Sequence, residues 1–225
     1  MVSPVLRARA EELVRRIERA ATSVADAQKA GTPLTRLKLL CKGLPRPDHE
    51  LALLLRTHPL LEARQMAALL ADPARMTLSF SDEWVGALDG PELCDFCAVQ
   101  LFAKTKAPLK LAERWIKKEK EWTRRTGFML LAALAAPRSA APEAELSKFF
   151  PFIKNHAADA RPTVYKAVNR ALKITAKKSP RLAQQAKRCA EDILDLFTDN
   201  QTACWVAKNA LFSFPASAQK TAGRK

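Results

Sequence analysis

Glycine, long apolar runs and complete catalytic motifs are scarce in this sequence, and each shortage narrows the class of protein. Only 6 of the 225 residues are Gly, and no Gly-rich phosphate loop is present, which argues against a nucleotide-binding protein. No apolar run approaches the ~20 residues that a membrane helix needs, so we expect no contact with a membrane. The N-terminal residues are rich in Arg and Glu and contain no apolar signal region, so we do not expect secretion.

The five cysteines are odd in number and irregularly spaced, which is typical of a reduced, cytoplasmic protein. Cys94 and Cys97 form a C-x-x-C pair with no second pair and no neighbouring His. Zinc binding normally needs four such ligands, so we expect these two to be small core residues on a helix. We therefore predict no metal site and no small-molecule cofactor.

The three histidines, His49, His58 and His156, are far apart in the sequence and lack acidic or Cys neighbours at ligand spacing. No Ser-His-Asp arrangement and no H-E-x-x-H motif is present, so these two motifs support neither a hydrolase nor a metalloprotease.

What the sequence does contain is helical patterning from end to end. Ala and Leu are abundant, no segment alternates with period 2, and prolines separate the apolar-periodic segments. Asp48 is a plausible N-cap, and Asp89-Gly90-Pro91-Glu92 resembles a helix start with an Asx cap. The predicted helices cover roughly 7–27, 48–58, 60–71, 92–104, 109–119, 121–135, 142–156, 162–178, 180–197 and 200–212.

These segments predict an all-α fold of about ten to twelve helices. A compact bundle and stacked helical pairs both suit the list, and pairs that recur every 35–45 residues favour a HEAT-like repeat solenoid. We expect one helical-repeat domain over residues 1–214, with divergent N-terminal helices over 1–45. We expect residues 215–225 to form a disordered, basic tail. A chain of this kind is expected to be a monomer.

The net charge of +15 lies in one stretch of the chain. Residues 101–190 contain 21 Lys and Arg against 6 Asp and Glu, an excess equal to that of the whole chain. An excess of positive charge confined to one stretch predicts a surface that binds a polyanion, and nucleic acid is the commonest polyanion.

Two stripes of cations occur at helical spacing inside this basic stretch. The first is Lys166, Arg170, Lys173 and Lys177, opposite an apolar face that includes Val164, Val168, Ala171 and Leu172. The second is Lys110, Arg114, Lys117 and Lys118. In a helical stack such stripes would line one wall and contact a duplex backbone. The alternative is that each stripe is a solvated helix face.

Arg124 and Arg125 fall near the start of the helix that begins at Lys120-Glu121-Trp122. Cations are disfavoured there by the helix dipole, and a bound phosphate would reverse that penalty. The alternative is an ion pair with Glu119 or Glu121.

Asp95 is surrounded in sequence by Leu93, Cys94, Phe96 and Cys97. A carboxylate on such a helix needs a partner if it is buried. It could be an anionic catalytic group on a nucleic-acid surface, as carboxylates are in glycosidic cleavage. It could equally be half of a structural Asp–Arg pair, and the residues alone do not decide between the two.

Several segments in order resemble the AlkD-like DNA alkylation repair enzymes, which are HEAT-like repeat DNA glycosylases. The likeness runs from about residue 45 to 213. The segments that carry it are Asp48-His49-Glu50-Leu51-Ala52, Glu62-Ala63-Arg64-Gln65-Met66-Ala67, Leu93-Cys94-Asp95, Glu121-Trp122-Thr123-Arg124-Arg125-Thr126, Lys166-Ala167-Val168-Asn169-Arg170-Ala171-Leu172 and Trp205-Val206-Ala207-Lys208-Asn209-Ala210-Leu211.

The resemblance implies an enzyme that removes N3- or N7-alkylated purines from double-stranded DNA without base flipping. Asp95 would stabilise the oxocarbenium-like transition state and orient water, and Arg125 would hold a phosphate beside the lesion. Pro91 and Trp122 would lie near the lesion site. Such an enzyme would act in the cytoplasm on the nucleoid.

The sequence differs from the family pattern at two positions. Pro91 stands where the family typically has a Trp four residues before the aspartate, and Arg170 stands where it has a second Trp. These differences favour the alternative of a non-catalytic HEAT-like protein that recognises damaged or structured DNA. A scaffold that binds an acidic protein is a third hypothesis.

Overall fold

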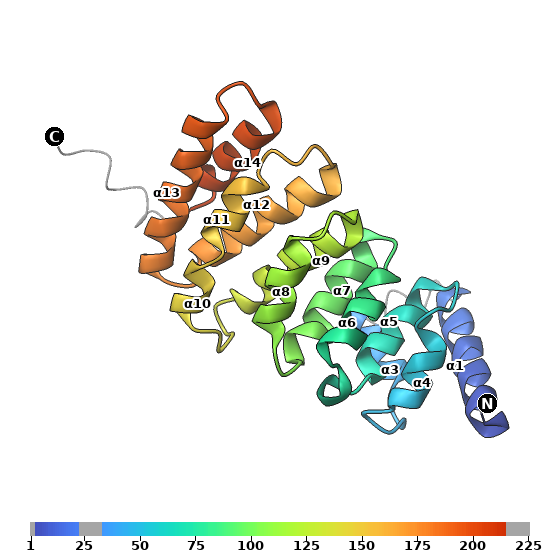
Figure 1. Cartoon of the computed structure of the whole chain (residues 1–225). Helices are drawn as coiled ribbons and strands as arrows, with labels where there is room; N and C mark the ends of the chain where they lie inside the picture. Colours follow the sequence, from blue (N-terminus) through green and yellow to red (C-terminus); the bar gives the residue numbers. More distant parts are fainter. Residues whose placement is uncertain (1–2, 23–32, 215–225) are drawn as a thin grey trace. The chain divides into compact units, whose positions relative to one another are not determined.

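The computed structural model describes residues 3–22 and 33–214, and these residues form helices without any strand. Figure 1 shows the helices in chain order. The described elements are α1 (Pro4–Thr22), α3 (Pro33–Leu40), α4 (His49–Leu55), α5 (Leu61–Leu70), η1 (Pro73–Arg75), α6 (Leu78–Gly86), α7 (Pro91–Gln100), η2 (Phe102–Lys104), α8 (Pro108–Ile116), α9 (Glu121–Leu134), α10 (Glu143–Ser147), α11 (Phe150–Asn155), α12 (Pro162–Ala176), α13 (Pro180–Leu196) and α14 (Gln201–Phe212). The prediction of an all-α fold is confirmed.

Most helix starts follow from local sequence chemistry. Proline occupies the first turn of α7, α8, α12 and α13, where its missing N–H removes no helical hydrogen bond. The Asp48 side chain accepts a hydrogen bond from Leu51 N and caps α4 as predicted. At α7 the cap is Gly90, without a side-chain hydrogen bond, so the predicted Asx cap at Asp89 is wrong.

The predicted helices differ from the observed ones in several places. α3 and α6 were not predicted, although Thr77 caps α6 by accepting from Phe80 N. The segment predicted as one helix over 142–156 is divided into α10 and α11, with Pro151 in the first turn of α11. The end of the predicted helix 7–27 lies outside the described residues.

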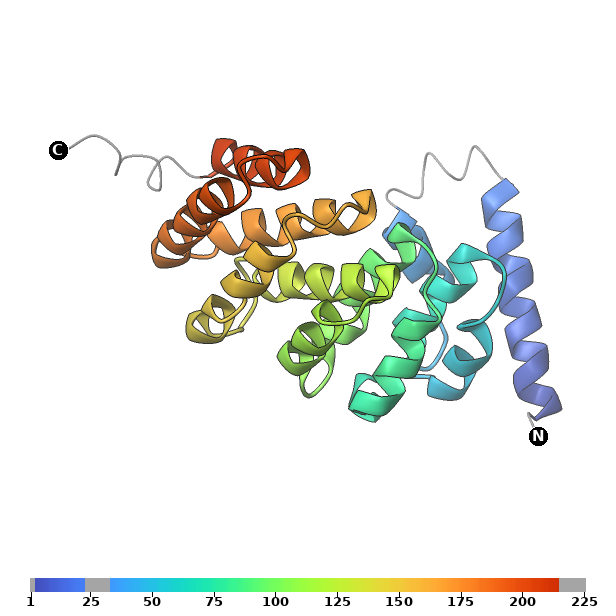
Figure 2. The same cartoon turned by 45° about the horizontal axis from the view of Figure 1, so that its top comes forward.

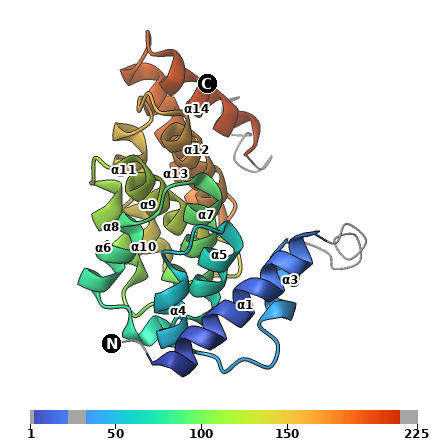
Figure 3. The same cartoon turned by 90° about the vertical axis from the view of Figure 1, so that its right-hand side faces the viewer.

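The chain divides into two compact units, residues 1–87 with 104–106, and residues 88–103 with 107–225. In the first unit, α1 packs against α4 and α5, and α3 packs against α5 (Figure 3). Its core includes Leu51, Leu55, Met66 and Leu70, all buried. The single domain expected over residues 1–214 stays a prediction, and the predicted tail 215–225 lies outside the described residues.

The second unit is built of two layers of helices. In what we call the first layer, α9 packs on α7 and α12, and α12 packs on α14. The second layer contains α8, α10, α11 and α13. Of these, α8 packs on α9, α11 packs on α12, α13 packs on α12 and α14, and α10 packs on α13. Figure 2 shows α9 (yellow-green) running beside α12 (light orange). Every residue of α9 is buried or partly buried, whereas α12 keeps an exposed side that includes Lys166, Arg170 and Lys177.

Gly127 permits the close approach of α8 and α9. A Cβ atom at this position would lie 2.7 Å from Ile116 N and 3.1 Å from Ala112 O, and both of these are backbone atoms of α8. The two helices therefore pack backbone to backbone at this point, and α9 is fixed on the second layer.

Candidate nucleic-acid interface

Each helix of the first layer carries a chemically distinct side chain at its fifth residue. These are Asp95 of α7, Arg125 of α9, Lys166 of α12 and Trp205 of α14. The helices are neighbours in this order. Asp95 contacts Arg125 at one end, and at the other end Trp205 contacts Tyr165, the residue before Lys166. We call these four residues the cross-row.

Asp95 and Arg125 form a two-point ion pair at one end of the cross-row. Arg125 Nε donates to Asp95 Oδ1 at 3.0 Å, and Arg125 Nη2 donates to Asp95 Oδ2 at 2.9 Å. Arg125 Nη1 donates to the Thr163 carbonyl oxygen of α12 at 2.6 Å. One guanidinium thus joins three helices, and the ion pair that sequence reasoning left open is present.

The Asp95 carboxylate is only partly withdrawn from the surface. Its side chain is 28% exposed, against 12% for Arg125. Burial raises the pKa of the Asp95 carboxyl, and the charges of Arg125 and Arg170 oppose that shift. Arg170 of α12 therefore acts as a second cation on Asp95, at the position where the family pattern has an indole.

The first predicted stripe lies on the uncovered side of α12. Lys166, Arg170 and Lys177 are exposed, and Lys173 Nζ donates to Asn209 Oδ1 of α14 at 3.1 Å. The opposite face of the helix is buried, including Val164, Val168, Ala171 and Leu172 as predicted. This stripe borders the Asp95–Arg125 pair on one side and α14 on the other.

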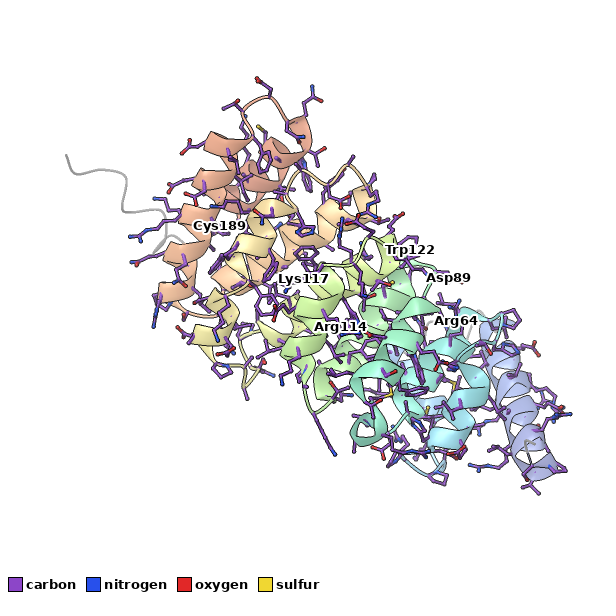
Figure 4. All side chains as sticks on the ribbon, in the orientation of Figure 1. Arg64, Asp89, Arg114, Lys117, Trp122 and Cys189 are labelled. Carbon is purple, nitrogen blue, oxygen red and sulfur yellow. The ribbon has the colours of Figure 1, made fainter. Side chains whose placement is uncertain are left out.

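The second predicted stripe belongs to the other layer. Figure 4 labels Arg114 on α8 and Lys117 just after the end of this helix. Lys117 Nζ pairs with Glu113 at 2.6 Å and lies 5.1 Å from the centre of the Phe152 ring of α11. Lys118 is exposed. The two stripes therefore do not line one row of helices, contrary to the expectation from sequence spacing.

Arg124 is directed into the protein, although it is adjacent in sequence to Arg125. Its Nε donates to Ile116 O, its Nη1 to Asp159 and its Nη2 to Glu119. The residue is 7% exposed. All three guanidinium nitrogens thus donate to protein oxygens, so we exclude Arg124 from the candidate DNA-binding surface. The predicted alternative of a pair with Glu119 is the arrangement observed.

Asp159 is the centre of that buried network. Burial opposes its ionisation, but hydrogen bonds from Arg161 and Arg124 prevail and lower the pKa of Asp159 to about 2. Arg161 also donates to Glu119 O at 2.7 Å. The network fixes the loops that precede α9 and α12, and with them the helices that carry Arg125 and Lys166.

Pro91 and Trp122 lie at the starts of α7 and α9, which pack together. Figure 4 labels Trp122 at this end of α9. The Trp122 carbonyl accepts from Thr126 Oγ1 at 2.7 Å and from Cys94 Sγ at 3.6 Å. Burial raises the pKa of the Cys94 thiol to about 11, so this thiol stays protonated. Cys94 and Cys97 are core residues of α7, as expected.

Trp205 is a surface residue to which sequence reasoning gave no role beyond its place in a segment that resembles the family. Trp84 and Trp115 are buried, whereas Trp205 is 42% exposed. Its ring makes an edge contact with Tyr165 of α12, with centroids 5.3 Å apart. Its position in the helix could have indicated it, because Trp205 is the fifth residue of α14 and Lys166 is the fifth residue of α12.

Within residues 3–22 and 33–214, no group of three His, Cys, Asp or Glu side chains is placed to hold a metal ion. In the same part of the chain, no helix combines the length and apolarity that a bilayer crossing requires.

Comparison with known proteins identifies the family. A model of the DNA alkylation repair enzyme family matches residues 9–188. The chain belongs to this family. The match begins well inside the N-terminal segment that we had expected to be divergent, and it ends within α13, before the helix that carries Trp205.

A solved structure shares the fold of this family member. It is described as one of a new family of proteins related to the HEAT-like repeat DNA glycosylases with affinity for branched DNA structures. The TM-score is 0.63 at 23% identity, over 70% of this chain and 67% of that chain. No curated protein matches the chain. The predicted HEAT-like fold and the predicted family are thus confirmed, and both indicate a function on DNA.

Proposed function

We propose that this family member binds the phosphate backbone of double-stranded DNA and recognises structured or damaged DNA without excising a base from it. The observation that carries the proposal is the pairing of Asp95. Arg125 holds both oxygens of this carboxylate at hydrogen-bond distance, and the charge of Arg170 acts on it as well, while Glu92 adds negative charge from the same helix. The Asp95 carboxylate is therefore already neutralised by a partner, which disfavours a cationic alkylated purine there, and the exposed cations of α12 beside it suit phosphate.

The remaining cations of the surface support the same function. Lys166, Arg170 and Lys177 are exposed along one side of α12. Lysine and arginine side chains at helical spacing can contact successive phosphates and release the counterions bound there. Such contacts do not depend on the base sequence. The structural relative with affinity for branched DNA supports structured DNA as the target, because a branch offers backbone on more than one side.

Salt-dependent binding to a duplex tests the proposal. Lys166→Glu with Lys173→Glu is expected to weaken duplex binding roughly 10- to 100-fold and to reduce the slope of log K against log salt by about 2. The loss should be the same for different duplex sequences. Equal affinity of the wild type and this variant at low salt would overturn the proposal.

Lys117→Glu with Lys118→Glu is the matched control, because it makes the same change of charge on the second layer. We expect a loss several-fold smaller than that of the α12 variant. An equal loss would mean that only net charge matters and that α12 is not the binding surface.

Glycosylase activity is the second candidate function, favoured by the 28% exposure of the Asp95 side chain. In this reaction the electron pair of the N-glycosidic bond leaves with the alkylated base, which becomes neutral, and water adds to the sugar cation. Asp95 would stabilise that cation, and Arg125 would exchange the carboxylate for a phosphate next to the lesion. Cationic bases leave without protonation, so no second acid is required.

Incubation with N7-methylated duplex distinguishes the two candidates. The first predicts no abasic sites above background for the wild type. The second predicts release of methylated purine by the wild type and none by Asp95→Asn. Equal release by both proteins would exclude Asp95 as the catalytic residue.

Three further expectations accompany either candidate. The protein should act as a monomer, bind double-stranded DNA without a small-molecule cofactor, and associate with the nucleoid in the cytoplasm. Sedimentation with and without a short duplex would test the first two.

A further inference from the structure

We propose that the exposed face of α14 stacks unpaired nucleobases next to the duplex held by α12. This inference rests on the proposed function, because α12 must place DNA beside α14. The site consists of Trp205, Lys208 and Phe212. It lies beyond residue 188, where the match to the family model ends.

The three side chains share one face of the helix. Positions separated by three, four and seven residues lie on the same side of an α-helix. Trp205 is 42% exposed and Phe212 is 90% exposed, and Lys208 between them is exposed as well. The opposite face, which includes Ala203, Val206, Ala207 and Ala210, is buried. The aromatic rings are therefore not part of the core of this unit.

The indole of Trp205 is held in place but keeps a free surface. Its contact with Tyr165 is edge-to-face, with ring planes inclined by 70°. Such a contact occupies at most one face of the indole, so the other can receive a planar ligand. Because Tyr165 already restricts the ring, less conformational entropy is lost when a base stacks on it.

The charges around these rings favour nucleic acid over an apolar protein segment. Lys208 lies between the two aromatic residues, and Lys173 of α12 reaches Asn209 on α14 at 3.1 Å. An alternation of aromatic rings and cations is how proteins bind single strands, with bases on the rings and phosphates on the cations. Trp205 and Phe212 are about 10 Å apart along the helix axis, so separate bases of one strand could occupy them.

The position of Trp205 connects this site to the duplex surface. It ends the cross-row that begins at Asp95 and passes through Arg125 and Lys166. A duplex held by α12 would place its frayed or branched strand on α14. Every duplex base is already stacked on its neighbours, so the rings would discriminate in favour of unpaired DNA.

The test compares a blunt duplex with a fork that carries the same duplex and one single-stranded arm. Trp205→Ala is expected to lower affinity for the fork about 5- to 100-fold, since stacking on an aromatic residue contributes that much per base. Affinity for the blunt duplex should change less than twofold. Trp205→Phe should retain most of the affinity for the fork, because it keeps an aromatic face.

Leu196→Ala serves as the control, since Leu196 is also an exposed apolar residue, 59% exposed, but lies on α13. It should leave both affinities unchanged. Circular dichroism of each variant checks that α14 stays folded. Binding of a single-stranded oligonucleotide should also quench tryptophan fluorescence in the wild type and much less in Trp205→Phe.

The outcomes separate this inference from the proposed function. If Trp205→Ala binds the fork as the wild type does, or loses duplex and fork affinity equally, the stacking site is overturned while phosphate binding by α12 stands. If the Lys166→Glu and Lys173→Glu variant binds the blunt duplex normally, the proposed function is overturned instead.

Discussion

Arg125 holds both carboxylate oxygens of Asp95 and, with its third nitrogen, the Thr163 carbonyl oxygen of α12. Removal of either partner leaves a poorly solvated charge, so each single change should destabilise the protein. Arg125→Ala and Asp95→Ala are each expected to cost about 1–2 kcal/mol in the free energy of unfolding. Urea unfolding of the two variants and of the double variant measures these costs.

The double variant should cost less than the sum of the two single changes, with a coupling of about 1 kcal/mol. Strict additivity would mean that the ion pair contributes nothing in solution. Arg125→Lys should behave almost as Arg125→Ala does, because an ammonium group cannot reproduce the planar fork.

Asp159 should make the stability of the protein depend on acid pH. Its pKa in the folded protein is about 2, below the ordinary 3.8. The folded state therefore binds the proton more weakly than the unfolded state does. The resulting stability, on the order of 2 kcal/mol, is present above pH 4 and is lost as the pH falls toward 2.

Urea unfolding between pH 6 and pH 2.5 checks this dependence. The wild type should be more stable than Asp159→Asn at pH 6, and the difference should hold down to about pH 4 and shrink below that pH. A difference that stays constant over this range would mean that Asp159 does not titrate as described.

Gly127→Ala should destabilise the packing of α8 on α9. The added methyl group would lie within 3.1 Å of two backbone atoms of α8, and backbone cannot move aside as a flexible side chain can. We expect a loss of more than 2 kcal/mol and a lower melting temperature.

Gly86→Ala provides the comparison, because nothing lies within 4 Å of an added Cβ at the end of α6. This change should be neutral or stabilising by up to about 1 kcal/mol. Similar melting temperatures for the two variants would contradict the close approach of α8 and α9.

Asn169 should tolerate no negative charge. Its buried amide donates to the Val206 carbonyl oxygen at 2.9 Å and joins α12 to α14. Asn169→Asp would place a carboxylate against that oxygen and should cost at least 2 kcal/mol at pH 7. Asn209→Asp faces Lys173 Nζ instead and should unfold within about 0.5 kcal/mol of the wild type. Equal losses would show that burial at Asn169 is unimportant.

Local chemistry made much of the architecture predictable. Proline in the first turn and the Asp48 cap depend only on neighbouring residues, so the starts of α4, α7, α8 and α12 follow from the sequence. The short helices were harder to predict. α3 has only eight residues, and α11 six, so their stability comes from packing rather than from intrinsic helix propensity.

The sequence by itself determined that the chain is helical, that its excess charge lies in residues 101–190, and that α12 has a cationic face opposite an apolar one. Only the tertiary structure decided the fate of individual charges. Arg124 and Arg125 are identical in chemistry, yet α9 turns one toward Asp159 and the other toward Asp95. Successive residues on a helix point about 100° apart, so neighbouring helices, distant in sequence, determine which side chain is buried and which reaches the surface.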